Sequence, residues 1–271
     1  MDRYLIGVDI DGTLLTSEKE LTYRTRKAIE EAARKGNVIV PVTGRPLSGI
    51  PESILECKEI EYIITSNGAV IYDLKKDRIM DSKCLPLDAC KFIYNKLYDK
   101  ALVFEVFIEG VAYETEQSLQ SLLNRRNNRK STEYLLKSRK VVQDPLALFE
   151  SGKVDEILAL IDEKYVDSQE LCEVVRSDAF QAVETMKNEF EMYNVSAGKG
   201  NSLIYIGDML GFTQEKIIAI GDSNNDLDMM EKAGVSIAMG NALDSVKKIA
   251  DRVTASNDQD GVAKVLERLW A

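Results

Sequence analysis

The sequence predicts an α/β protein in which a doubly wound, mostly parallel, Rossmann-like core sheet carries an inserted α+β domain. Short apolar runs alternate with helical segments over residues 1–82, and the same alternation returns over residues 196–271. Strands that alternate with helices indicate a parallel sheet with both faces covered. Residues 83–195 differ, because apolar and polar residues alternate around Phe104, Val106 and Ile108 as in a half-buried antiparallel strand. We therefore expect two core segments, residues 1–82 and 196–271, and one inserted domain, residues 83–195.

The first core segment is expected to contain three buried strands, at residues 5–8, 38–42 and 62–65. A helix over residues 22–35 has an apolar face and ends before Gly36, which suits a helix C-cap. Residues 46–57 are expected to be a helical stretch that Pro51 makes irregular. Asn67-Gly68 predicts a tight turn into residues 69–72.

The second core segment repeats this pattern, and the inserted domain does not. In the core we expect helices over residues 201–210, 227–233, 245–250 and 261–269, and strands over 217–220, 235–238 and 252–254. In the inserted domain we expect strands over 102–114, 157–161, 179–186 and 189–195, and helices over 87–98, 117–128 and 167–175. The basic cluster at residues 124–130 is interpreted as solvated surface.

Composition excludes several classes of function. The net charge of −10 argues against a nucleic-acid partner, whose backbone needs clustered Lys and Arg. No apolar run approaches the length of a membrane span, so we expect no membrane partner. Histidine is absent, which removes Ser-His-Asp triads and the usual zinc sites. The four cysteines form no CxxC pair, which is typical of reduced thiols, and we expect a cytoplasmic protein.

The most informative segment is Asp9-Ile10-Asp11-Gly12-Thr13, which directly follows an apolar strand. Two carboxylates at the edge of a core are costly unless a metal, a proton or a partner compensates them. The pair places a carboxylate that can act as a nucleophile beside one that can carry a proton. That arrangement suits phosphoryl transfer through an aspartyl-phosphate.

Three further segments follow strands or begin helices, where open α/β sheets bind ligands. Thr43-Gly44 offers a hydroxyl and an amide to phosphate oxygens. Lys199 is a lone cation between two glycines, and residues 221–226 (Gly-Asp-Ser-Asn-Asn-Asp) form an acidic loop after a strand. Each segment alone has an ordinary structural explanation, but their joint occurrence at strand ends favours an active site.

These four segments resemble the motifs of the haloacid dehalogenase-like hydrolases, in the Cof-type sugar-phosphatase group. The first motif is Asp9-Ile10-Asp11-Gly12-Thr13-Leu14-Leu15, and the second is Thr43-Gly44-Arg45-Pro46. Lys199 matches the third motif, residues 221–226 match the fourth, and residues 65–69 (Thr-Ser-Asn-Gly-Ala) also resemble the group. Thr13 and Thr43 are only 30 positions apart, whereas 156 positions separate Thr43 from Lys199. The additional residues between Thr43 and Lys199 correspond, by this resemblance, to the family's second cap type, an α+β lid.

The resemblance implies a Mg²⁺-dependent phosphatase that acts on small phosphorylated metabolites, notably sugar phosphates. Asp9 would be the nucleophile and Asp11 the general acid and base. The side chains of Asp9 and Asp222, with the carbonyl of Asp11, would hold Mg²⁺. Asp226 would orient these groups from a second layer. The phosphate would be held by Thr43, Gly44, Lys199 and Asn225.

Two alternatives stay open at this point. One is a phosphomutase of the same superfamily, and the other is a non-catalytic signalling or binding module that carries a phospho-aspartate. Asp11 and the inserted domain argue against the signalling module, whose receiver domains are about half this length. The roles of Arg45 and Asn67, the oligomeric state and the physiological substrate are not predicted.

Overall fold

The computed structural model describes residues 3–125 and 129–269. Its internal contacts divide the chain into two compact units. Unit 1 contains residues 1–43, 51–81 and 198–271, and unit 2 contains residues 44–50 and 82–197. The expected division at residues 82/83 and 195/196 stays a prediction about domains, and the contact units add the short segment Gly44–Ile50 to the second unit.

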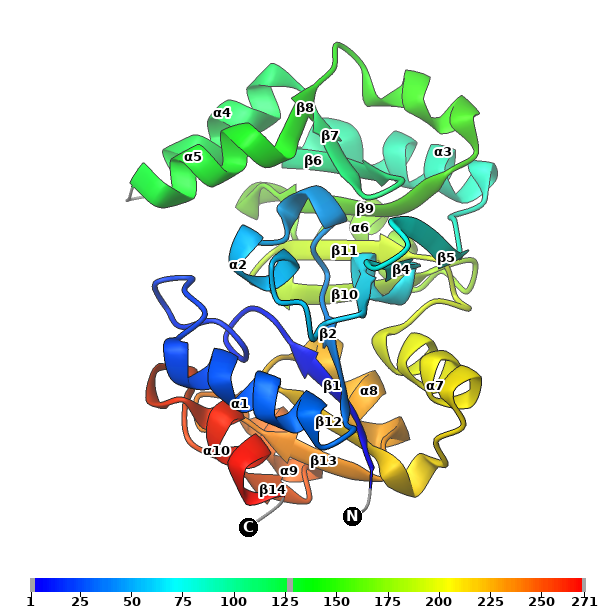
Figure 1. Cartoon of the computed structure of the whole chain (residues 1–271). Coiled ribbons are helices and arrows are strands. Elements are labelled where there is room, and N and C mark those ends of the chain that lie inside the picture. The colour runs from blue at the N-terminus through cyan, green and yellow to red at the C-terminus, as the bar shows by residue number, and fades with distance from the viewer. Residues whose placement is uncertain (1–2, 126–128, 270–271) are drawn as a thin grey trace. The chain divides into compact units, whose positions relative to one another are not determined.

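Unit 1 is built on an eight-stranded sheet of order β14-β13-β12-β1-β2-β3-β4-β5 (Figure 1). The strands are β1 (Leu5–Asp9), β2 (Val38–Val42), β3 (Tyr62–Thr65), β4 (Val70–Asp73), β5 (Arg78–Ser82), β12 (Ile217–Gly221), β13 (Val235–Ala238) and β14 (Arg252–Val253). The strands from β14 to β3 pair in parallel, and β4 runs antiparallel to β3. The predicted α/β class with a mostly parallel sheet is therefore confirmed.

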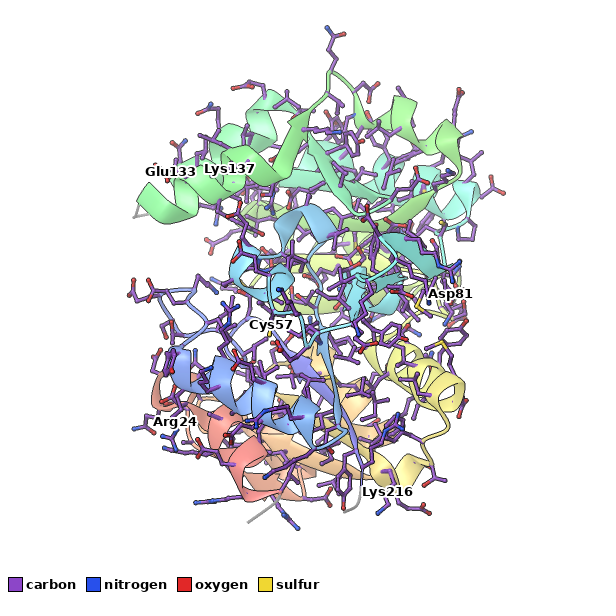
Figure 2. All side chains as sticks on the ribbon, in the orientation of Figure 1. Arg24, Cys57, Asp81, Glu133, Lys137 and Lys216 are labelled. Carbon is purple, nitrogen blue, oxygen red and sulfur yellow. The ribbon has the colours of Figure 1, made fainter. Side chains whose placement is uncertain are left out.

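The helices of unit 1 follow the strands in the predicted alternation. They are α1 (Tyr23–Arg34), α2 (Glu52–Leu55), α7 (Lys199–Leu210), α8 (Leu227–Lys232), α9 (Asp244–Ile249) and α10 (Gly261–Arg268), with the 3₁₀ helices η2 (Ser66–Gly68), η6 (Gln214–Lys216), η7 (Asn224–Asp226) and η8 (Asn257–Gln259). Helices α1 and α10 lie side by side (Figure 1). Arg24, labelled on α1 in Figure 2, donates from two nitrogens to the Glu267 carboxylate of α10. None of the described helices is long and apolar enough to cross a membrane.

Unit 2 is an α+β unit with a six-stranded sheet of order β10-β11-β9-β6-β7-β8. Its strands are β6 (Ala101–Ile108), β7 (Val111–Glu114), β8 (Arg139–Val141), β9 (Val154–Ile161), β10 (Gln181–Met186) and β11 (Glu189–Tyr193). All neighbours are antiparallel except β7 and β8. Its helices are η1 (Leu47–Gly49), α3 (Leu87–Leu97), η3 (Tyr98–Lys100), α4 (Glu116–Asn124), α5 (Arg129–Ser138), η4 (Pro145–Ser151), η5 (Glu163–Tyr165) and α6 (Gln169–Val175).

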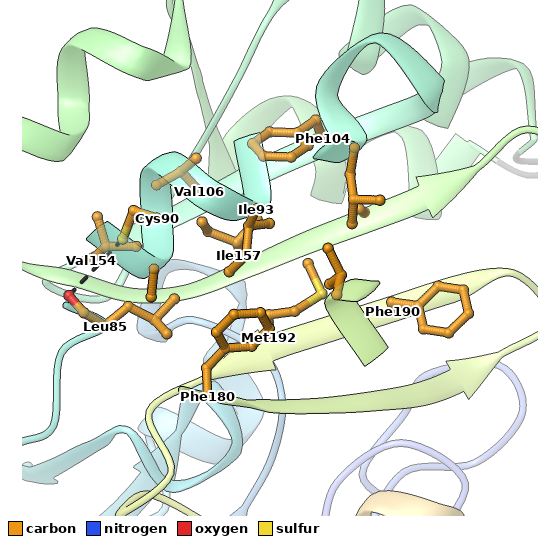
Figure 3. Packing of buried hydrophobic residues seen from close by; sticks show 14 of the residues in the cluster. Leu85, Cys90, Ile93, Phe104, Val106, Val154, Ile157, Phe180, Phe190 and Met192 are labelled. Carbon is orange, nitrogen blue, oxygen red and sulfur yellow. Dashed lines mark hydrogen bonds between the residues drawn. The ribbon is translucent and has the colours of Figure 1, made fainter. Parts of the chain in front are cut away.

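Alternate residues of the central strands of unit 2 build its main core. Phe104 and Val106 of β6 pack with Ile157 of β9 and Met192 of β11 against the apolar face of α3 (Figure 3). The opposite face of the sheet carries Val103, which packs in a smaller cluster with α4 and α5. The period of two seen in the sequence therefore reflects a sheet with helices on both faces.

The segment Gly44–Ile50 is held in unit 2 by four contacts. The Ser48 main-chain N–H donates to the Gly110 carbonyl at 2.8 Å, and the Ser48 hydroxyl donates to the Ser138 carbonyl at 2.8 Å. The Tyr134 hydroxyl donates to the Gly49 carbonyl at 2.9 Å. The guanidinium of Arg45 lies over the Tyr134 ring, 4.9 Å from its centre. The loop after β2 is thus anchored to the inserted part of the chain.

Most expected elements agree with the structure, and three strands (38–42, 62–65 and 235–238) agree to the residue. The expectation of a single strand over residues 102–114 is wrong, because the structure has two strands there, β6 and β7. Glu109 and Gly110 have positive φ (47° and 80°) and form a two-residue turn between β6 and β7. The helical stretch expected over residues 46–57 is broken before Pro51 into η1 and α2. The end of the helix expected over 117–128 lies outside the described residues.

Among the described strands and α-helices, β5, α5 and β8 were not expected from the sequence. Strand β5 lies at the edge of its sheet, and β8 has only three residues. The start of α5 coincides with the basic cluster, which had been interpreted only as surface. Part of that cluster lies outside the described residues.

Candidate active site

The proposed site residues of unit 1 converge because three parallel strands end at one sheet edge. Asp9 is the last residue of β1 and lies beside Val42 of β2 in register. On the other side of β1, Val8 lies beside Ile220 of β12. Thr43 and Asp222 therefore follow the neighbouring strands at the level of Asp9, as the sequence predicted.

Lys199 connects two of the carboxylates. As the first residue of α7, its side chain is buried, and its Nζ lies 2.7 Å from both Asp9 Oδ1 and Asp226 Oδ1. Burial lowers the pKa of the Lys199 ammonium, but the charges of Asp226 and Asp9 outweigh burial and hold this pKa above its usual value. Lys199 is therefore a permanently charged, buried cation at this edge of the sheet.

The pKa of the Asp9 carboxyl is raised by its surroundings. Burial and the neighbouring charge of Asp226 raise its pKa well above the usual value, and Lys199 lowers this pKa without cancelling the rise. Burial likewise raises the pKa of Asp222 to about 6, although the Thr13 hydroxyl opposes this by donating to Asp222 Oδ1 at 2.7 Å. A divalent cation beside these groups would favour their ionised forms.

Asp226 is engaged through both of its oxygens. Oδ1 accepts from Lys199, and Oδ2 accepts from the main-chain N–H groups of Asp222 and Ser223 at 2.9 and 3.0 Å. Ser223 and Asp226 also form a capping box at the start of η7. This carboxylate is occupied with shaping the loop and orienting Lys199.

Two glycines make room for the acidic loop. Gly12 has φ of +80°, and a Cβ atom there would lie 2.5 Å from Asp222 Oδ2. A Cβ atom on Gly221 would lie 2.6 Å from the Asp226 side chain. Any larger residue at either position would displace a carboxylate of the site.

The turn after β3 contacts the second and fourth motifs. The Asn67 N–H donates to the Thr43 carbonyl at 3.0 Å, and the Asn225 side-chain amide donates to Asn67 Oδ1 at 3.1 Å. Ser66 and Asn67 both have positive φ, 48° and 49°. Such a conformation costs about 1–3 kcal/mol for each non-glycine residue and is concentrated at functional sites.

Asp11 contacts a different lysine, and Gly44 belongs to the other contact unit. The Asp11 carboxylate is partly exposed and pairs with Lys19, with Asp11 Oδ1 2.7 Å from Lys19 Nζ. Gly44 belongs to unit 2 through the segment Gly44–Ile50. The roles predicted for both residues stay predictions.

Sequence reasoning missed several contributors. Thr13 was recognised only as part of a motif, yet its hydroxyl fixes Asp222. Ser223 bonds Asn225 Oδ1 at 2.6 Å and caps η7, and the Ser223–Asp226 spacing of a capping box was the available signal. Asp228 accepts from the Gly200 N–H at 2.7 Å and so anchors the helix start that carries Lys199. No sequence pattern identifies Lys19, because its contact with Asp11 depends on the conformation of the loop between them.

The donor set fits a hard divalent cation. Asp9, Asp222 and Asp226 offer carboxylate oxygens that lie within 4.8 Å of one another. Ionised, these three groups and Lys199 sum to two negative charges, which a divalent cation neutralises. Oδ2 of Asp9 and Oδ2 of Asp222 accept no hydrogen bond from residues 3–125 or 129–269, whereas both oxygens of Asp226 do. Asp9 and Asp222 are therefore the side chains best placed to hold a divalent cation.

Comparisons with known proteins identify the family of the chain. The family model for haloacid dehalogenase-like hydrolases matches residues 6–266. A putative phosphatase of Bacillus subtilis, YxeH, is 29% identical over 248 residues, which cover 88% of this chain and 87% of the relative. The B. subtilis 5-amino-6-(5-phospho-D-ribitylamino)uracil phosphatase YcsE is 30% identical over 245 residues, which cover 89% and 86% of the two chains.

Solved structures share the fold over nearly the whole chain. A haloacid dehalogenase-like hydrolase from B. subtilis superposes with a TM-score of 0.84 at 28% identity, covering 98% of this chain and 99% of that one. Another from Bacteroides thetaiotaomicron gives 0.80 at 28% identity, covering 99% and 100%. The chain belongs to the haloacid dehalogenase-like hydrolases, as its four motifs predicted.

Proposed function

We propose that this enzyme is a Mg²⁺-dependent phosphatase that hydrolyses small phosphorylated metabolites through an aspartyl-phosphate on Asp9. The observation that carries the proposal is the cluster of three carboxylates around buried Lys199 at the end of β1. Its two excess negative charges suit one divalent cation, and its single buried ammonium suits a phosphoryl oxygen.

Asp9 acts as the nucleophile in the first step. One of its carboxylate oxygens attacks phosphorus, a P–O bond forms to Asp9, and the P–O bond to the leaving group breaks. Asp11 donates a proton to the departing oxygen. This role requires the Asp11 side chain to leave Lys19, and the exposure of both groups makes that exchange inexpensive.

Hydrolysis of the aspartyl-phosphate restores the enzyme. Asp11, now ionised, accepts a proton from a water molecule that attacks phosphorus, and the bond between phosphorus and the Asp9 oxygen breaks. Inorganic phosphate leaves with both carboxylates returned to their starting forms. The side chains of Asp9 and Asp222 and the carbonyl of Asp11 would hold Mg²⁺, which would supply charge neutralisation for the phosphoryl oxygens.

The remaining residues hold the phosphoryl group in line. We assign this task to Thr43, Lys199 and Asn225, and to the Gly44 amide, on the resemblance of their motifs. Asp226 keeps Lys199 and the acidic loop in position. Fixed donors of this kind provide most of the acceleration in phosphoryl transfer, because little other chemistry is needed.

The substrate class rests on the relatives. The two relatives named above carry the names of a putative phosphatase and of a phosphatase for a phosphorylated ribityl compound. We therefore propose a phosphorylated sugar or sugar derivative as the substrate, and residues 83–195 as the lid that selects it. Four free cysteines and an acidic chain support a cytoplasmic enzyme without a nucleic-acid partner.

The test is phosphate release from a panel of sugar phosphates, with and without metal. We expect release with Mg²⁺, none in EDTA, and full recovery when Mg²⁺ is restored. Conversion of one sugar phosphate into its isomer without phosphate release would instead support the phosphomutase. A phosphorylated Asp9 that persists for hours without turnover would support the signalling module.

A further inference from the structure

The turn Ser66-Asn67-Gly68 contacts all three segments to which the proposed function assigns the phosphate, namely the segments after β2 and β12 and the start of α7. The Asn67 N–H reaches the Thr43 carbonyl, and Asn67 Oδ1 accepts from Asn225. The Gly68 carbonyl accepts from the Ser202 hydroxyl of α7 at 2.7 Å. A Cβ atom on Gly68 would lie 2.2 Å from the Gly198 carbonyl oxygen, directly before Lys199.

Within this turn, the Asn67 side chain determines how Asn225 is presented. The Asn225 side chain is fixed at both ends, because its Oδ1 accepts from Ser223 Oγ at 2.6 Å and its Nδ2 donates to Asn67 at 3.1 Å. Nδ2 carries two hydrogens, and Asn67 takes one of them. The direction of the second hydrogen is then set by the amide plane, which leaves it for a phosphoryl oxygen.

The backbone of the turn holds Asn67 in the left-handed conformation. Asn67 has φ of 49° and ψ of 33° and no exposed surface. Ser66 before it also has positive φ. Two consecutive left-handed residues that are not glycine persist only where the surrounding contacts enforce them, and such strain gathers at functional sites.

We infer that Asn67 is a positioning residue that orients the Asn225 amide, and through it sets the affinity of the site for the phosphoryl group. The inference rests on the proposed function for the role of Asn225. It assigns Asn67 no contact with the substrate's leaving group.

The test compares Asn67→Gly with Asn188→Gly. Glycine tolerates positive φ, so Asn67→Gly removes the amide without adding strain. Asn188 also has positive φ, 65°, but lies in the turn between β10 and β11 and serves as the matched control. Binding of inorganic phosphate is measured by calorimetry in Mg²⁺, and kcat/KM is measured with p-nitrophenyl phosphate and an alkyl phosphate.

We expect Asn67→Gly to weaken phosphate binding about tenfold, the loss typical of one oriented hydrogen bond to a charged ligand. Because Asn67 acts on the phosphoryl group, kcat/KM should fall by the same factor for both esters. The double variant Asn67→Gly/Asn225→Ala should bind phosphate no worse than Asn225→Ala alone. The inference would be overturned if Asn67→Gly bound phosphate as tightly as Asn188→Gly does. It would also be overturned if the losses of phosphate affinity in the two single variants added up in the double variant.

A readout without turnover separates this inference from the proposed function. The side-chain amide signals of Asn225, assigned by their absence in Asn225→Ala, should shift in Asn67→Gly and stay in place in Asn188→Gly. If the wild type releases no phosphate from any ester but the Asn225 signals still shift in Asn67→Gly, the phosphatase is refuted and Asn67 remains the residue that positions Asn225. An unshifted Asn225 amide in an active enzyme would refute only the role of Asn67.

Discussion

Replacing Lys199 by methionine should destabilise unit 1, because it leaves two buried carboxylates without their shared cation. The side chains of Lys199, Asp9 and Asp226 are only 1%, 6% and 0% exposed, and both N–O distances are 2.7 Å. At an effective dielectric constant near 20, each contact is worth about 6 kcal/mol in Coulomb energy. Removing buried Lys199 recovers several kcal/mol of its desolvation, so we expect a net loss of about 3–5 kcal/mol.

The loss of stability in Lys199→Met should become smaller as the pH falls. The pKa of Asp9 is already raised by burial, and without Lys199 this pKa rises further. The folded variant then binds a proton that the unfolded chain has released, so its stability increases as the pH falls. The difference between Lys199→Met and the wild type should therefore be smaller at pH 5.5 than at pH 8.

The assay is thermal unfolding followed by circular dichroism, in EDTA so that no metal compensates the carboxylates. A loss of 3–5 kcal/mol corresponds to a fall of roughly 6–20 °C in Tm for a unit of this size. The control is Lys248→Met, which removes an exposed lysine of α9 and should change stability by less than about 0.5 kcal/mol. Equal Tm values for the two variants, or a larger loss at acidic pH, would refute the electrostatic reasoning.

Three other predictions concern single carboxylates. Asp9→Asn should keep the wild-type circular dichroism spectrum and lose detectable phosphate release, and near-normal rates would exclude the aspartyl-phosphate mechanism. Asp11→Asn should slow alkyl phosphates by about 10²–10⁴-fold but p-nitrophenyl phosphate far less, because that leaving group needs little protonation; equal losses would reject the acid–base role. Burial raises the pKa of Asp155 to about 7, against 3.8 when unfolded, although the Gly110 N–H opposes the rise. Folded Asp155 therefore keeps a proton that the unfolded chain loses, and stability falls as the pH rises through this window. The free energy of unfolding of Asp155→Asn, measured with urea, should rise relative to that of the wild type by about 2.5 kcal/mol between pH 5 and pH 8. Parallel pH profiles of the two proteins would contradict this prediction.

The core could be predicted from the sequence because its signals are local. Apolar runs such as residues 38–42 are long enough to identify a buried strand, and each motif directly follows or precedes one. Parallel pairing then brings the strand ends together without further information. The same reasoning failed at Glu109-Gly110, since the period of two continues across a two-residue turn that lacks the usual Asn-Gly or Asp-Gly signal.

The rest of the site depends on contacts between distant residues. The bond from Asn225 to Asn67 joins positions 158 residues apart, and the bond from Thr13 to Asp222 spans 209. Periodicity and propensity carry no information on such pairs. The left-handed backbone of Ser66 is likewise a product of packing, because serine gives no sequence signal for positive φ.

The anchoring of Gly44–Ile50 in unit 2 has a consequence for exchanging parts between relatives. The chain passes between the units at four junctions, 43/44, 50/51, 81/82 and 197/198, rather than at two. A chimaera spliced only at the last two junctions would carry Ser48 and Gly49 of one parent against the counterparts of Gly110, Tyr134 and Ser138 from the other. The inserted domain is therefore not interchangeable on its own, and a functional graft also has to replace the recipient's seven-residue loop Gly44–Ile50 with the loop of the parent that donates the domain.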